Sequence, residues 1–82
     1  MDQIFEFTLD ADVYENNNRT KVCVPKSAIT GLENNSNNPN SCVVHVGLTT
    51  VYYVKATYKV VRQLVYGNDI INVPEAVDEA LW

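Results

Sequence analysis

Apolar residues occupy both sides of one predicted hairpin, in the segment VVHVGLTTVYYVKATY (43–58). Two strands are expected at 42–47 and 50–56, and Gly47 supplies the permissive position in the turn between them. A strand in a small domain usually has one face toward the core and one toward water. Here two apolar faces result: Val44, Val46, Tyr52 and Val54 on one side, and Val43, Val51 and Tyr53 on the other. The second face must therefore contact something other than the core.

A second hairpin is predicted at the N-terminus. Residues 3–14 alternate with a period of two, which is typical of a half-buried strand. The sequence ENNNR marks a turn, since asparagine tolerates left-handed backbone angles. Residues 20–25 form the returning strand, which Pro25 ends because it has no amide hydrogen to donate. The apolar side of the first strand is expected to hold Phe5, Phe7, Leu9, Ala11 and Val13.

The pattern changes to a helical period after the second hairpin. A helix is predicted over 57–66, with Thr57 as its N-cap and Gly67 closing its C-terminus. Its apolar side is expected to hold Tyr58, Val61, Leu64 and Val65. A short last helix is predicted at 74–81, where Pro74 suits the first helical position. Residues 26–33 fit either one helical turn or a third short strand.

These elements predict a single domain over 1–82 of the α+β class. A small antiparallel sheet of the two hairpins would be packed by the helix at 57–66. The Asn-rich segment 33–41 contains no apolar residue, so we expect a flexible surface loop, with a binding loop as the alternative. Residues 68–82 form the tail.

Charge is divided unevenly along the chain. The net charge is −4, yet all six basic residues lie between residues 19 and 62. Overall acidity argues against nonspecific binding of nucleic acid, because such binding depends on neutralising phosphates. Three of the basic residues, together with Tyr66, predict a cationic strip that would bind a small anionic ligand. The strip consists of Lys55, Lys59, Arg62 and Tyr66. The alternatives are an ordinary solvated helix face paired with the tail acids, or a contact used by a nucleic-acid-associated regulator.

The residues needed for catalysis are sparse. The chain has one histidine, His45, and two cysteines, Cys23 and Cys42, without a CxxC pair. Metal ligands at ordinary spacing, a phosphate-binding loop and a dinucleotide motif are missing from the sequence, so we expect no enzyme, no metal and no cofactor. The acidic N-terminus and the lack of a long apolar run predict a cytoplasmic protein without a membrane contact.

Residues 20–66 resemble a known layout. The pattern KVCVPKSAITGLE … VVHVGLTTVYYVKATYKVVRQLV is similar to small flagellar proteins of the FlbD/SwrD type. The resemblance implies a strand, a hairpin with an apolar–Gly turn and a terminal amphipathic helix, and a flagellar accessory role. The Leu-Asn-Gly turn of that family is absent here, and Ala56 stands where the family has Glu. The positions that correspond are Ile29, Glu33, Gly47, Tyr52, Val54 and Lys55.

The expected function is therefore binding. Three covers fit the second apolar face: the C-terminal tail folded back over the sheet, a second copy of the chain, or a foreign partner. We expect a homo-oligomer to which the tail contributes, since homodimers are the commonest closed assembly. Its contact residues would be Val43, Val51, Tyr53 and Trp82. Such an assembly would recognise a protein or a small anionic ligand. Size and class also suit an accessory protein of a phage or mobile element, such as an inhibitor of host defence.

Overall fold

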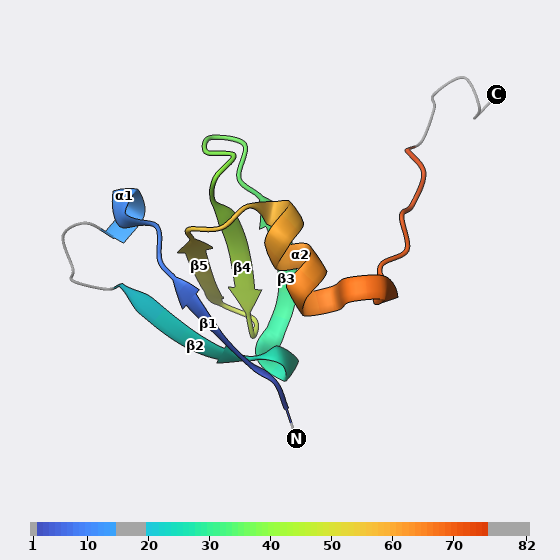
Figure 1. Cartoon of the computed structure of the whole chain (residues 1–82), viewed down its shortest axis with the longest axis horizontal. Coiled ribbons are helices and arrows are strands. Elements are labelled where there is room, and N and C mark those ends of the chain that lie inside the picture. The colour runs from blue at the N-terminus through green and yellow to red at the C-terminus, as the bar shows by residue number, and fades with distance from the viewer. Residues whose placement is uncertain (1, 15–19, 76–82) are drawn as a thin grey trace.

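The computed structural model describes residues 2–14 and 20–75. This part of the chain has an α+β fold with two antiparallel sheets and a helix after the last strand (Figure 1). The first sheet pairs β1 (Ile4–Thr8) with β2 (Lys21–Pro25). The second has the order β3-β4-β5, with β3 (Ile29–Asn34), β4 (Cys42–Val46) and β5 (Thr50–Val54). The predicted class is confirmed, whereas the predicted single sheet is wrong.

The hairpin of β4 and β5 matches its prediction closely. Cys42 pairs with Val54 and Val44 pairs with Tyr52, and the turn at Gly47 has a φ of 62°. Cys42, Val44 and Val54 are fully buried. Their face of the sheet is therefore the core face, as the alternation indicated.

The N-terminal strand is shorter than the predicted strand over 3–14, because the chain turns into a short helix after Leu9. β1 ends at Thr8, and a short helix, α1 (Ala11–Tyr14), follows. A carboxylate oxygen of Asp10 accepts the amide of Asp12, and the Asp10 carbonyl accepts the amides of Val13 and Tyr14. Aspartate competes in this way with strand pairing. The predicted turn at 15–19 lies outside the described residues.

The two sheets are joined where β1 ends. Leu9 forms an antiparallel bridge with Val54. The amide of Lys55 donates to the carbonyl of Thr8 at 2.7 Å, and the amide of Asp10 donates to the carbonyl of Tyr53 at 2.9 Å. The end of the first hairpin thus extends the edge of β5 without closing a barrel.

Residues 26–33, which fit either one helical turn or a third strand, adopt the two conformations in succession. A 3₁₀ turn, η1 (Lys26–Ala28), follows Pro25 and leads directly into β3. Glu33 and Asn34 belong to β3, so the predicted loop 33–41 begins two residues later, at Asn35. The register of β3 against β4 shifts between Ile29 and Gly31.

The predicted helix is present as α2 (Tyr58–Tyr66). The Thr57 hydroxyl oxygen accepts the amide of Val60 at 3.3 Å, and Gly67 ends the helix with a φ of 56°. Val61 and Val65 are buried, but Leu64 keeps 64% of its surface exposed. The assignment of Leu64 to the core side is wrong, because at 100° per residue it lies well away from the Val61–Val65 line.

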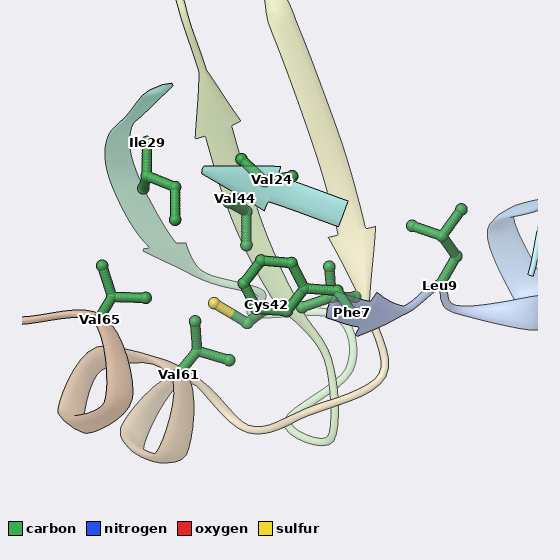
Figure 2. Close-up of a cluster of buried hydrophobic side chains, with 9 residues drawn as sticks. Phe7, Leu9, Val24, Ile29, Cys42, Val44, Val61 and Val65 are labelled. Atoms are coloured by element: carbon green, nitrogen blue, oxygen red, sulfur yellow. The ribbon is translucent and has the colours of Figure 1, made fainter. Parts of the chain in front are cut away.

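The core lies between α2, the first sheet and the inner face of the second. Val61 and Val65 point from the helix toward Cys42 and Phe7 (Figure 2). Burial of these side chains supplies the main stabilising term for so short a helix. The buried apolar residues are Phe7, Leu9, Val24, Ile29, Cys42, Val44, Val54, Val61 and Val65.

The tail begins with a second 3₁₀ turn, η2 (Gly67–Asp69). Residues 70–75 have no regular structure and extend away from the sheets (Figure 1). Ile71 and Val73 are more than four-fifths exposed. Pro74 and Glu75 are not helical, and the rest of the predicted helix at 74–81, like Trp82, lies outside the described residues.

Candidate functional site

The outer face of the three-stranded sheet carries the second apolar set. Val43 pairs with Tyr53, and the next pair on the same face of the sheet is His45 with Val51. Val51 is 38% exposed and Tyr53 is 36% exposed, while Val43 is half-buried. Three of the four residues predicted for the oligomer contact thus share one surface, and Trp82 is not described.

A polar pair lies on this same outer face. The Nε2 atom of His45 contacts the Oε1 atom of Glu33, which lies on the neighbouring strand β3. Both side chains are partly exposed. The outer face of Glu33, Val43, His45, Val51 and Tyr53 contains no lysine or arginine, so it offers little to an anionic partner.

The predicted basic strip is divided between two places. Lys59, Arg62 and Tyr66 follow one side of α2 at helical spacing, and an Arg62 guanidinium nitrogen donates to the Oδ1 atom of Asn72 at 3.0 Å. Lys55 precedes the helix and lines a hollow with Asp10 and Asp12 instead. Tyr66 packs partly against the core. Only the α2 portion is therefore available as a cationic strip.

A polar cleft lies between α1 and the Asn-rich loop. It has a volume of about 340 Å³, and its lining consists of Asp10, Ala11, Asp12, Asn38, Asn40 and Lys55. A second hollow adjoins it, sharing Asp10, Asp12 and Asn38 and reaching Asn35, Asn37 and Tyr53. Sequence reasoning missed this cleft, although the Asn-rich binding loop was one of its alternatives.

The Asn-rich loop is held in two successive turns. The Oδ1 atom of Asn35 accepts the amide of Asn37, and the Oδ1 atom of Asn38 accepts the amide of Asn40, each at 3.0 Å. The amides of Asn38 and Ser41 complete these turns on main-chain carbonyls. Side-chain bonds to nearby amides are the reason that asparagine favours turns. These bonds shape the loop into two successive turns, and its predicted flexibility stays a prediction.

The carboxylate of Asp10 connects the loop to α1. Asp10 is only 6% exposed. Its Oδ1 atom accepts the amide of Asp12 at 3.0 Å, and its Oδ2 atom lies 3.5 Å from the Nδ2 atom of Asn38. The second contact is at the outer limit of a hydrogen bond. This buried carboxylate consequently has acceptor capacity left beside the cleft.

Neither cysteine thiol contacts the histidine, His45, whose ring contacts Glu33 instead. The Cys23 thiol lies 3.6 Å from a Glu6 carboxylate oxygen, and the Cys42 thiol is 3.5 Å from the Glu33 carbonyl. Both are free thiols. Desolvation, and then the Glu6 carboxylate, raise the pKa of Cys23, and burial raises the pKa of Cys42. Raised pKa values make both thiols poor nucleophiles at neutral pH.

Metal-ligand groups and membrane-spanning helices were sought within the described residues. Residues 2–14 and 20–75 contain no group of three or more His, Cys, Asp or Glu side chains that could hold a metal ion. Among the helices of those ranges, none has the length and apolar character needed to cross a membrane.

Comparisons of the chain with protein-family models, with curated proteins and with solved structures found no match. The candidate binding surfaces of the described residues are the outer face, the side of α2 with Lys59 and Arg62, and the polar cleft.

Proposed function

We propose that this chain is a non-enzymatic binding protein that works as a homo-oligomer through the outer face of its three-stranded sheet. The observation that carries the proposal is the exposure of Val51 and Tyr53 beside Val43, on the opposite side of the sheet from the buried core residues. An apolar cluster on the flat side of a sheet is a common site of protein association.

A second copy of the chain is the partner that suits this face best. A two-fold contact places the same patch on both sides, so the patch must be complementary to itself. The outer face combines apolar side chains with one acid and one imidazole, in contact at Glu33 and His45. The Glu33 carboxylate thus has a partner within each copy, and the five residues of this face include no cluster of like charges that a strongly charged foreign partner would bind.

The proposal is tested by native mass spectrometry and sedimentation of the full chain with two lysine variants. Val51→Lys puts a charge in the centre of the outer face and is expected to give monomers. Leu48→Lys is the matched control, because Leu48 is fully exposed at the tip of the hairpin. A monomeric wild-type chain at all concentrations overturns the proposal. If the oligomer survives Val51→Lys, or if Leu48→Lys dissociates it, the outer face is not the contact between copies.

For the recognised molecule, we propose a protein or a small anionic ligand, the latter on Lys59 and Arg62 of α2. The support is the helical spacing of these residues and the separate location of Lys55 beside two carboxylates. Replacing Lys59 and Arg62 with Glu should abolish binding of an anion or of nucleic acid while self-association persists. If Val51→Lys abolishes binding of a protein partner and the Lys59 and Arg62 variants do not, the recognised molecule is a protein and not a small anion. The roles as a phage accessory protein or a flagellar accessory protein are finer proposals of this same binding class.

A further inference from the structure

The polar cleft between α1 and the Asn-rich loop lies beside the outer face, and the hollow that adjoins it shares Tyr53 with that face. Its lining contains acceptors in Asp10 and Asp12, a cationic donor in Lys55, and amides in Asn38 and Asn40, which both donate and accept. A cleft of about 340 Å³ is within the usual range for small-molecule sites. The cleft thus has the size and the polar groups of a site for one small molecule.

The buried carboxylate of Asp10 gives this cleft its strongest hydrogen-bond acceptor. A buried charge is costly unless hydrogen bonds satisfy it. Asp10 has one short bond, from the amide of Asp12 at 3.0 Å, and one marginal contact, from Asn38 at 3.5 Å. A carboxylate offers about four acceptor positions. A ligand that donates hydrogen bonds would complete the set.

The charges around the cleft narrow the chemical class of a ligand that could donate hydrogen bonds to Asp10. Two carboxylates beside Lys55 disfavour an anion, and the Lys55 ammonium group disfavours a metal cation or an organic cation. A neutral ligand with several hydroxyl groups avoids both penalties. Each hydroxyl donates to a carboxylate while it accepts from an amide or an ammonium group.

The neighbouring hollow adds an apolar surface to these polar groups. It is lined by Tyr53, which is 36% exposed, together with Asn35 and Asn37. An aromatic ring can cover the C–H face of a sugar ring while amides bond its hydroxyls. The two turns of the loop fix Asn35 and Asn38 before any ligand arrives, so little ordering entropy is lost on binding.

We propose that this cleft binds a neutral polyhydroxylated ligand of the carbohydrate class. Asp10 and Asp12 would accept from its hydroxyl groups, Lys55 and Asn40 would donate to them, and Tyr53 would cover one face of the ring. The hydrogen-bonding residues of this site lie outside the proposed self-association contact, and Tyr53 is the one residue named in both.

The test is a ¹⁵N–¹H NMR titration of the full chain with a panel of neutral mono- and disaccharides. The amide signals of residues 10–12, 35–38, 40, 41 and 55 are expected to shift with at least one sugar; Pro39 has no amide hydrogen. Lys55→Met and Asn40→Ala should each weaken that binding about tenfold, the worth of one good hydrogen bond. Lys59→Met is the matched control, since Lys59 lies on α2 outside the cleft, and it should leave the affinity unchanged.

These two cleft variants are chosen because neither side chain has a hydrogen bond that the fold depends on, whereas Asp10 initiates α1. Titrations with citrate and with spermidine accompany the sugars as charged probes. The absence of shifts with every sugar in the panel would overturn the proposal. So would stronger binding of either charged probe at the cleft, or sugar binding that Lys55→Met and Asn40→Ala leave intact.

Discussion

The main-chain amide of Asp10 donates a hydrogen bond to the carbonyl oxygen of Tyr53 at 2.9 Å, at the point where the two sheets join. Asp10 lines the polar cleft, while Tyr53 belongs to the outer face and borders the adjoining hollow. One backbone contact therefore fixes the cleft relative to the proposed contact surface. Its neighbour Val54, which bridges to Leu9, anchors that contact in the core.

Val54→Ala is expected to destabilise the fold far more than Val51→Ala, although both changes remove the same atoms from β5. Val54 is fully buried, and Val51 is 38% exposed. The buried change should lower the free energy of unfolding by about 2 kcal/mol, because it leaves a cavity. The exposed change should cost less than about 0.5 kcal/mol in the monomer. Urea denaturation at low protein concentration checks this, and equal losses would contradict the observed register.

Ser27→Ala is expected to cost stability only above acidic pH. The hydrogen bond from the Ser27 hydroxyl is the main cause that lowers the pKa of Asp2 below its ordinary value of 3.8. A lowered folded-state pKa gives stability that is full above the unfolded pKa and is lost as pH falls through the folded one. The difference between wild type and variant should thus be constant near neutral pH and shrink below about pH 4.

Denaturation curves at several pH values measure this difference. Ser36→Ala serves as the control, because Ser36 is exposed in the Asn-rich loop. A Ser27→Ala effect that is the same at acidic and neutral pH would show that the Asp2 carboxylate is not its cause.

Glu6→Gln is expected to increase the reactivity of Cys23 severalfold near neutral pH. Local desolvation is the largest cause of the raised Cys23 pKa, and the Glu6 carboxylate raises it further. Removing the acid lowers that pKa, because both the hydrogen bond and the charge of Glu6 raise it. More thiolate forms, and alkylation becomes faster.

The measurement is the iodoacetamide rate, followed by peptide mass spectrometry so that each cysteine is read separately. Cys42 should stay unmodified in the folded chain because it is fully buried. Glu33→Gln is the control acid on another strand. If Glu6→Gln and Glu33→Gln change the Cys23 rate equally, the local carboxylate has no specific influence on it.

The sequence predicted the elements that local chemistry determines. Thr57 and Gly67 mark the ends of α2 because a hydroxyl cap and a left-handed closing residue each have a strong preference. The β4–β5 hairpin follows from alternation on both sides of Gly47. Leu64 was misassigned because four apolar residues in one helix fit more than one stripe, and packing against the sheet selects Val61 and Val65.

The candidate cleft could not be predicted in the same way. Asp10 and Asp12 continue the alternating pattern of the first strand, so the turn at Asp10 is hidden in it. The approach of Asn38 to Asp10 joins residues 28 positions apart, and such pairing depends on how the sheets join. By contrast, Val43, Val51 and Tyr53 were recognised from a local pattern, because two strands of a tight hairpin must share their faces.

The junction of β1 with β5 also has a consequence for the order of folding. The strands β3, β4 and β5 follow one another through short connections, and α2 comes directly after them. The contact between the Tyr14 phenol and the Tyr53 amide closes a loop of 39 positions instead. Contacts that close long loops are costly in entropy and form late. We therefore expect the N-terminal hairpin to join the core last, and until it does, the edge of β5 would be open to pairing with another chain.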